Sequence, residues 1–244
     1  MALEGALAQG FKALELDVSE AQRAQLVRYA DLLLAQNEHM NLTAITEPLD
    51  IAELHFLDCA ALLTLDGGAL FPDNGINLRL IDVGTGAGFP GVVLKILRPS
   101  LHVTLLDSQQ KRIDWLETLC ADLGLTGIAF VHGRGEVLGH DAAFREQFDL
   151  ATARAVAPLP LLSELCLPFV KTGGRFLAMK GAKAQDELKD AAKSIRALGG
   201  GAETVYAYRL PQSSAPRALV SISKLAPTAG EYPRKWTKMK KAAQ

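Results

Sequence analysis

The chain has 244 residues, of which 49% are hydrophobic, so its length allows one large domain or one domain with a small extension. No apolar run reaches the roughly 18 residues that a membrane-spanning helix needs, and the N-terminus lacks the basic start of a secretion signal. Its three cysteines are widely spaced, which fits buried, reduced thiols better than disulfides or metal ligands, so we expect a cytoplasmic protein without a metal centre.

The formal net charge of −1 conceals an asymmetry between the two parts of the chain. Residues 1–75 carry a net charge of −9, whereas residues 76–244 carry +8. A basic body favours a polyanionic partner such as a phosphate backbone. Many proteins carry such an excess for solubility alone, so the asymmetry by itself leaves the partner open.

Residues 1–75 are predicted to form a helical extension. Helical spacing covers 3–14 and 19–37, and Ser19 with Gln22 forms a capping box at the start of the second helix. A further helix begins at Pro48. The stretch 66–77, DGGALFPDNGIN, is rich in turn residues and marks the boundary to the main domain.

Residues 76–225 alternate short apolar strands with helices. The expected strands are 78–83, 102–106, 128–132, 148–153 and 174–180, and the expected helices are 89–97, 108–123, 158–168 and 183–198. This alternation predicts an α/β fold, a parallel sheet covered on both faces. Two strand-like runs, 203–209 and 217–224, have no helix between them and predict a terminal antiparallel hairpin. Residues 226–244 are expected to form a loose, basic tail.

The stretch 78–91, LRLIDVGTGAGFPG, is typical of a strand that enters a tight, ligand-binding loop and then a helix. Gly84, Gly86 and Gly88 fall within five residues, and the following helix offers free N–H groups at its start. A dinucleotide fingerprint has glycine at the sixth position, where this chain has Phe89. The spacing therefore favours a ligand without a pyrophosphate, such as S-adenosylmethionine; a glycine-rich turn without any ligand is the alternative.

Further candidate residues lie at the ends of the next strands, because ligands of open α/β sheets bind beyond the carboxyl ends of the strands. Asp107 suits the two hydroxyls of a ribose, or it favours the dipole of the following helix. Gly135 and Glu136 follow the third strand, where an adenine ring would lie, although Glu136 could equally be a solvated acid. Arg154 could bind an anionic group or form a structural ion pair.

Taken together, these stretches resemble the RsmG (GidB) family, the bacterial 16S rRNA guanine-N7 methyltransferases. The matching segments keep the family's order and are NLTAIT at 41–46, HFLDCA at 55–60, DVGTGAGFPG at 82–91, DSQQKR at 107–112, GRGE at 133–136, ARAVAPL at 153–159 and GGRFLAMKG at 173–181. The tail departs from the family pattern, because YPR continues as KWTKMKKAAQ rather than with a glycine and a proline. The resemblance implies a class I, Rossmann-like methyltransferase fold.

The resemblance also implies roles for individual residues. Those expected to bind S-adenosylmethionine are Gly84, Gly86, Gly88, Phe89, Asp107, Gly135, Glu136 and Arg154. The implied reaction is methyl transfer to N7 of a guanine in the decoding-region loop of 16S rRNA. Guanine N7 has a lone pair and no proton to lose, so the reaction needs no general base, and no catalytic residue is assigned.

Several other residues are expected to face the RNA, either 16S rRNA or the small ribosomal subunit. His55 and Asp58 match the N-terminal motifs of the family, although a histidine packed between helices is the alternative for His55. Basic residues predicted at the rim of the cleft are Arg134, Lys180 and Lys183. The basic tail surrounds Trp236, a pattern that suits single-stranded RNA or a solubilising terminus.

Other functions remain open at this point. The chain could be a class I methyltransferase that acts on another substrate, or an RNA-binding protein that keeps the fold without catalysis. A nicotinamide-dependent dehydrogenase is disfavoured by Phe89 and by the terminal hairpin. We expect a monomer that does not bind a membrane.

Overall fold

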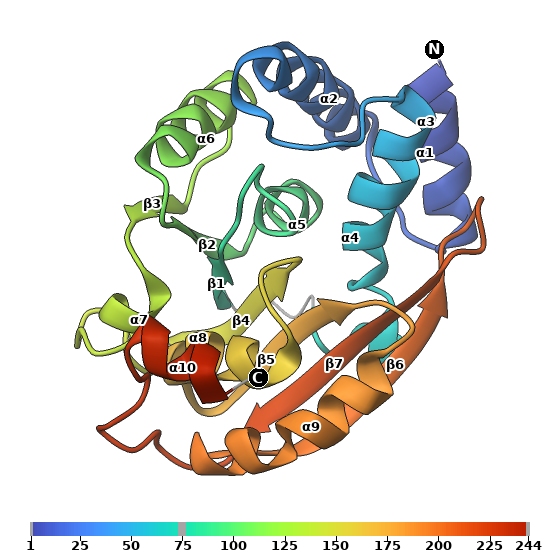
Figure 1. Ribbon diagram of the computed structural model, residues 1–244. Coiled ribbons are helices and arrows are strands. Elements are labelled where there is room, and N and C mark those ends of the chain that lie inside the picture. The colour runs from blue at the N-terminus through green and yellow to red at the C-terminus, as the bar shows by residue number, and fades with distance from the viewer. Residues whose placement is uncertain (1, 73–76, 243–244) are drawn as a thin grey trace.

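The computed structural model describes residues 2–72 and 77–242 and contains a seven-stranded sheet with helices on both faces (Figure 1). The strands are β1 (Arg79–Val83), β2 (His102–Asp107), β3 (Ile128–His132), β4 (Phe148–Arg154), β5 (Val170–Lys180), β6 (Gly200–Arg209) and β7 (Pro216–Lys224). They lie in the order β3-β2-β1-β4-β5-β7-β6. The first five strands are parallel, and β7 runs antiparallel to both β5 and β6. The predicted parallel sheet and terminal hairpin are therefore confirmed.

Helices of the main domain cover the sheet on both sides. They are α5 (Gly91–Leu97), α6 (Gln110–Asp122), α7 (Gly135–Leu138), α8 (Leu159–Cys166), α9 (Ala184–Ala197) and α10 (Trp236–Ala242). In Figure 1, α5 and α6 lie above the sheet, whereas α7 to α10 lie below it. The short helix α7 was not predicted, because a single turn carries too few residues to show a period.

The N-terminal segment forms two long helices and an irregular third one. The elements are α1 (Ala2–Ala13), α2 (Glu20–Met40), α3 (Pro48–Ile51), a π-helical segment (Ala52–Leu57) and α4 (Asp58–Ala61). The capping box at the start of α2 is confirmed: the Ser19 side chain accepts from the backbone N–H of Gln22, and the Gln22 side chain accepts from the Ser19 N–H. The π-helical turn was not predicted; such turns are rare and occur often at functional sites.

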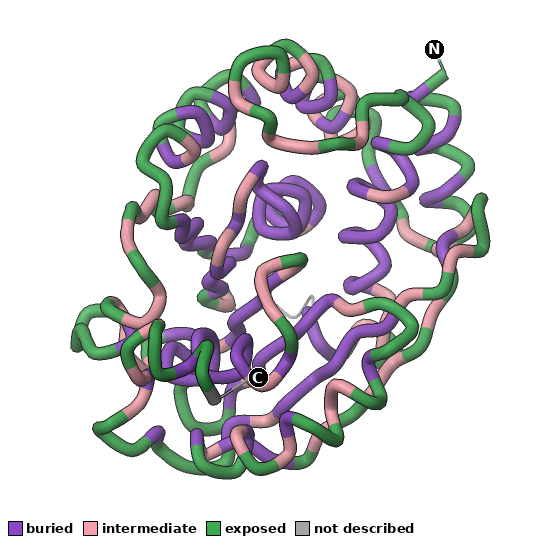
Figure 2. The backbone as a smooth tube through the Cα atoms, viewed as in Figure 1, coloured by how far each residue is buried: buried purple, intermediate pink, exposed green. Residues whose placement is uncertain are grey.

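Two hydrophobic clusters hold the helices to the sheet. The first joins α1 to α6 with one face of the sheet, and the second joins α8, α9 and α10 with the other face. Figure 2 shows that α5 is buried along its whole length, because the N-terminal helices cover the side that would otherwise face solvent. Residues before and after position 75 thus contribute to one core, and the domain boundary proposed at this position stays a prediction.

The C-terminal segment differs from the expectation of a loose tail. Met239 is 1% exposed and belongs to the second hydrophobic cluster. The guanidinium of Arg234 forms a two-armed ion pair with Glu164 of α8, at 2.6 and 2.9 Å. Arg145 donates to the carbonyls of Thr228 and Tyr232 at 2.5 and 2.8 Å. The prediction was wrong because it counted polar residues and could not see these long-range partners.

Candidate active site

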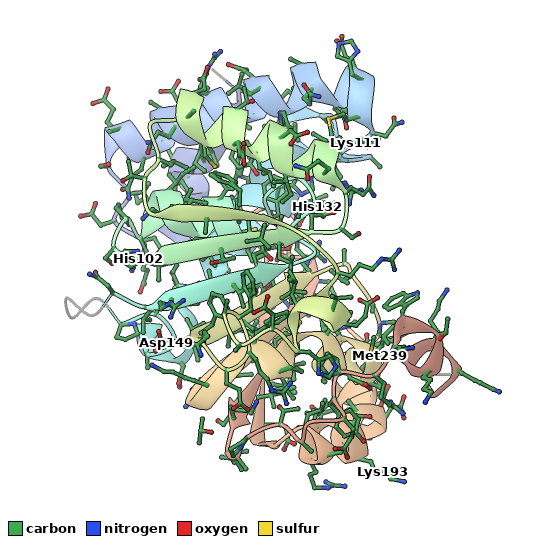
Figure 3. The ribbon with its side chains drawn as sticks, turned by 90° about the vertical axis from the view of Figure 1, so that its left-hand side faces the viewer. His102, Lys111, His132, Asp149, Lys193 and Met239 are labelled. Carbon is green, nitrogen blue, oxygen red and sulfur yellow. The ribbon has the colours of Figure 1, made fainter. Side chains whose placement is uncertain are left out.

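Two cavities lie on the side of the sheet where the parallel strands end. In Figure 3, His102 and Asp149 near the starts of β2 and β4 lie on the left, and His132 at the end of β3 lies on the right. Both cavities open among residues that follow strand ends. They flank the segment 154–157 at the point between β1 and β4 where the strand order reverses, which is where open α/β sheets bind ligands.

The narrow cavity, which has a volume of 160 Å³, lies beyond the ends of β1, β2 and β3. Its walls combine backbone of the glycine loops, two acidic side chains and an apolar surface. The lining residues are Val83, Gly84, Leu106, Asp107, Ser108, Gly133, Arg134, Gly135, Glu136, Val156, Leu165 and Trp236. Of the residues predicted to bind the cofactor, Gly84, Asp107, Gly135 and Glu136 therefore lie together in one cavity.

The loop that follows β1 is held in shape by the buried carboxylate of Asp82. Its Oδ2 accepts from the Thr85 hydroxyl at 2.7 Å and from the Gly91 N–H at 2.9 Å, so it ties both ends of the loop. Gly84 has a φ of 72°, in the left-handed region that favours glycine. A Cβ on Gly84 would lie 2.7 Å from Val156 Cγ2, so only glycine allows this close approach.

Asp107 is buried at the end of β2 and is partly satisfied by the protein. Its Oδ2 accepts from the Gly86 N–H at 3.0 Å and pairs with Arg112 at 3.3 Å, while Oδ1 accepts from the Gln109 N–H at 2.9 Å. A carboxylate offers about four acceptor positions, so one position on Oδ1 remains for a ligand hydroxyl. Glu136, which lines the same cavity, lies 3.6 Å from the guanidinium of Arg134.

Among the described residues that line the two cavities, neither Phe89 nor Gly88 is present. Phe89 is 5% exposed and stacks between Tyr29 and His55, at centroid distances of 5.3 and 4.4 Å. A Cβ on Gly88 would meet the Tyr29 hydroxyl at 2.6 Å. Gly88 and Phe89 thus pack against the N-terminal helices. Their contact with the cofactor stays a prediction, as does that of Gly86.

The wide cavity, with a volume of 440 Å³, lies beyond the ends of β4 and β5. The N-terminal helices, the central strands and the hairpin each contribute to it. Its lining residues are Ile45, Leu54, His55, Asp58, Arg154, Ala155, Met179, Lys180, Gly181, Tyr208 and Arg217. His55, Asp58 and Lys180, which were predicted to face the substrate, are therefore brought together here.

Arg154 lies in the wide cavity rather than in the narrow one. Its guanidinium donates to the Leu54 carbonyl at 2.9 Å and pairs with Asp58 at 3.4 Å, and its Cζ lies 4.8 Å from the ring centroid of Phe89. These contacts match the structural ion pair that the sequence left open. Arg154 fixes the π-helical turn against the sheet, and its cofactor role stays a prediction.

His55 is held as a neutral imidazole. Arginine can only donate, so the contact of 3.1 Å between Arg154 Nη2 and His55 Nδ1 makes Nδ1 an acceptor. The proton then lies on Nε2, which donates to the Thr43 hydroxyl at 2.9 Å. Burial, together with the charge of Arg154, lowers the pKa of His55 to about 3. Neither ring nitrogen is free to take a proton from a substrate.

Asp58 is the acidic group of the wide cavity. Its Oδ1 accepts from the Tyr208 hydroxyl at 2.8 Å and lies 3.6 Å from Arg217. Burial raises the pKa of Asp58, whereas the charges of Arg154 and Arg217 and the hydrogen bond from Tyr208 lower it in part. Burial, together with the Asp58 carboxylate, raises the pKa of Tyr208, whose neutral hydroxyl stays a donor.

The residues predicted to hold RNA differ in their accessibility. Arg134 is 64% exposed at the rim of the narrow cavity, and Lys183 is exposed at the start of α9. Lys180, by contrast, is nearly buried: its Nζ donates to the Ala157 carbonyl at 2.8 Å and pairs with Glu187 at 2.7 Å. Lys180 therefore lines the wall of the wide cavity, and it does not present a free cation at the rim.

Sequence reasoning missed several lining residues. Tyr208 and Arg217 reach the wide cavity through the hairpin, whose register against β5 no local pattern reveals. Trp236 reaches the narrow cavity on α10. The basic residues around Trp236 were the available signal in the sequence, and this pattern was interpreted as suiting single-stranded RNA or a solubilising terminus.

Two properties of the described residues concern metals and membranes. No group of three or more histidine, cysteine or acidic side chains in residues 2–72 and 77–242 could hold a metal ion. None of the helices over the same residues is both long and apolar enough to cross a membrane.

Solved structures share the fold of this chain. A predicted O-methyltransferase from Agrobacterium tumefaciens is 14% identical with a TM-score of 0.50, over 72% of this chain and 94% of that one. MtNAS in complex with MTA and tNA has a TM-score of 0.54 and 13% identity, over 83% of this chain and 71% of that one. The parallel sheet and the antiparallel β7 form the class I, Rossmann-like methyltransferase fold.

The sequence comparisons identify the family. Residues 22–214 match the profile of GidB, rRNA small subunit methyltransferase G. The chain is 45% identical to ribosomal RNA small subunit methyltransferase G of Alkaliphilus oremlandii, over 96% of both proteins. It is 46% identical to the protein of the same name from a Geobacillus strain, over 90% of both. The chain belongs to the rRNA small subunit methyltransferase G family.

Proposed function

We propose that this protein transfers a methyl group from S-adenosylmethionine to N7 of a guanine in 16S rRNA. The observation that carries the proposal is that neighbouring residues just after β4 line two different cavities, one suited to a nucleoside cofactor and one suited to a base. Gly84 lines the first cavity and lies against Val156, and Ala155, one residue away, lines the second. A methyl donor and its acceptor could therefore approach each other across this segment.

The narrow cavity fits the adenosine part of the cofactor. Asp107 retains an acceptor position for a ribose hydroxyl, and apolar side chains including Leu106, Leu165 and Trp236 provide a surface for a flat ring. Glu136 and the nearby backbone of 133–135 offer polar groups for the edge of an adenine. When bound, S-adenosylmethionine supplies an electrophilic methyl group on a sulfonium ion.

The wide cavity fits a guanine that has left its stack. Guanine offers N–H donors on one edge and the acceptors O6 and N7 on the other. Asp58 is an acceptor for the first edge, and the cations of Arg154 and Arg217 suit O6 on the second, which leaves the lone pair of N7 for the methyl group. Ile45, Leu54 and Met179 add an apolar surface. A base that enters this cavity must be in a loop or flipped out of a helix.

The chain's residues act by positioning and electrostatics rather than by proton transfer. N7 attacks with a lone pair and releases no proton, so the site needs no base. The neutral His55, both of whose nitrogens are engaged, agrees with such a reaction. Asp58 would hold the base in orientation while positive charge moves from sulfur toward the guanine ring.

A pair of variants tests the two cavities separately. Calorimetry measures the binding of S-adenosylmethionine, and transfer of a labelled methyl group to undermethylated small ribosomal subunits measures the reaction. Asp107→Asn should weaken cofactor binding by about tenfold, because it removes one charged acceptor. Asp58→Asn keeps the cofactor affinity, but its kcat/KM for transfer falls by about 10- to 100-fold.

Each outcome has a defined meaning. Absence of cofactor binding by the wild-type protein favours a non-catalytic RNA-binding protein. Binding without transfer to the small subunit favours a methyltransferase for another substrate. Equal loss of cofactor affinity in both variants contradicts the assignment of the wide cavity to the guanine. An rRNA substrate also supports a cytoplasmic location for the protein, because ribosomes are assembled there.

A further inference from the structure

The C-terminal helix α10 reaches the narrow cavity from the far end of the chain. Trp236 opens α10 and lines this cavity together with Asp107, Gly135 and Leu165. Figure 3 shows Met239 of α10 on the same side of the molecule as His132 at the end of β3. The indole therefore lies on the side where the parallel strands end.

Trp236 is held in place by the contacts of its neighbours. Two residues before it, Arg234 pairs with the buried Glu164, whose Oε1 also accepts from the Arg234 N–H at 2.7 Å. Three residues after it, the buried Met239 anchors α10 in the second hydrophobic cluster. His140, just beyond α7, lies 2.8 Å from the Pro233 carbonyl through its Nε2. Anchors on both sides fix the approach of the indole to the cavity before any ligand binds.

The residues that line the cavity match the two parts of an adenosine. Asp107 has an acceptor position for the ribose, and the loop 133–136 provides polar groups for the edge of the base. The flat face of an adenine needs an apolar or aromatic surface. Trp236 is half-buried, so its ring is partly accessible to a ligand. Lys240 Nζ lies 5.9 Å from its ring centroid.

We propose that Trp236 is a cofactor-binding residue that packs against the adenine ring of S-adenosylmethionine and forms the outer wall of its cavity. The inference rests on the proposed function, because it assumes that the narrow cavity binds this cofactor. It assigns to α10 a role in cofactor affinity, in place of the RNA contact that the basic sequence suggested.

The binding of S-adenosylhomocysteine to two variants tests the inference. Base–aromatic stacking is lost in Trp236→Ala, whose affinity falls by about tenfold, whereas Trp236→Phe keeps an aromatic ring and stays within about threefold of the wild type. Free adenosine loses affinity by the same factor, because the contact involves the base. Circular dichroism confirms that each variant is folded.

Intrinsic fluorescence provides a second, independent readout, because the chain has two tryptophans. Trp115 of α6 is buried and does not line the narrow cavity. S-adenosylhomocysteine changes the emission of the wild type and of Trp115→Phe, and leaves that of Trp236→Phe unchanged. Wild-type affinity in a folded Trp236→Ala overturns the inference but not the proposed function. A wild type that does not bind the ligand overturns both.

Discussion

At the scale of residues, a column of side chains joins the glycine loop to the N-terminal helices. Tyr29, Phe89 and His55 stack in sequence, and the Tyr29 hydroxyl donates to the Ala87 carbonyl in the loop. Arg154 lies over the Phe89 ring and binds His55. The loop that borders the narrow cavity is thus supported by a column of side chains of which two, His55 and Arg154, also line the wide cavity. Phe89 distinguishes this loop from a dinucleotide site because it fills a packing position.

His55 gives this column a pH dependence. Its pKa is about 3 in the folded protein, because of burial and the charge of Arg154, against about 6.5 in the unfolded chain. Below pH 6.5 the unfolded chain takes up a proton that the folded protein does not, so stability is lost as the pH falls. Between pH 7.5 and 5 this loss amounts to about 2 kcal/mol.

Urea unfolding of the wild type and of His55→Gln at several pH values measures the effect. Glutamine is neutral throughout, so the wild type should lose about 2 kcal/mol more than the variant between pH 7.5 and 5. Burial raises the pKa of Asp82 to about 6, which makes the protein more stable as the pH falls. This effect is the same in the wild type and in His55→Gln, so it cancels when their stabilities are compared. Parallel curves for the two proteins contradict a neutral, buried His55.

At the scale of elements, α1 is an N-terminal helix with two glycines in opposite environments. Gly10 is buried against Leu57 in the π-helical turn, where an added Cβ would clash. Gly5 is exposed, and no atom lies within 4 Å of the position of its Cβ. The close approach at Gly10 lets α1 support the irregular turn that carries Leu54 and His55.

The two glycines form a matched pair of substitutions. Gly5→Ala should stabilise the protein by about 0.5–1 kcal/mol, because alanine loses less backbone freedom in a helix. Gly10→Ala should destabilise it by about 1–3 kcal/mol, because Leu57 is fully buried and cannot move aside. Denaturant unfolding measures both, and a stabilising Gly10→Ala would show that α1 does not pack closely on the turn.

Elements with a clear period could be predicted from the sequence, and elements fixed by distant partners could not. The strands β1 to β4 and the helices α6 and α9 lie within two residues of the predicted ranges, because each buries a regular apolar pattern. α10 has seven residues, and Glu164, which anchors the segment before it, lies 70 positions earlier in the chain. No local pattern could indicate that contact.

At the scale of the whole molecule, the same distinction applies to the site. The narrow cavity follows consecutive strand ends, so Gly84, Asp107 and Glu136 could be grouped by the rule for open α/β sheets. The wide cavity joins Ile45 and Arg217 from opposite ends of the chain. Its composition depends on how the N-terminal helices and the hairpin fold over β4 and β5, and only the structure reveals that.

The charge distribution of the whole chain agrees with an RNA substrate but does not select one. The basic excess lies in residues 76–244, and Arg134 and Lys183 are exposed near the strand ends. Phosphate contacts of this kind position a nucleic acid and carry little information on sequence. Recognition of the base must therefore depend on the wide cavity. Identification of the modified base tests the proposed function.

Mass spectrometry of nucleosides from small ribosomal subunits provides that report. Subunits that lack the modification are incubated with the protein and S-adenosylmethionine, and their 16S rRNA is then digested and mapped. The expected result is one new 7-methylguanosine in the decoding-region loop, formed by the wild type and strongly reduced with Asp58→Asn. Methylation of another atom or another base, or no methylation of 16S rRNA at all, would contradict it.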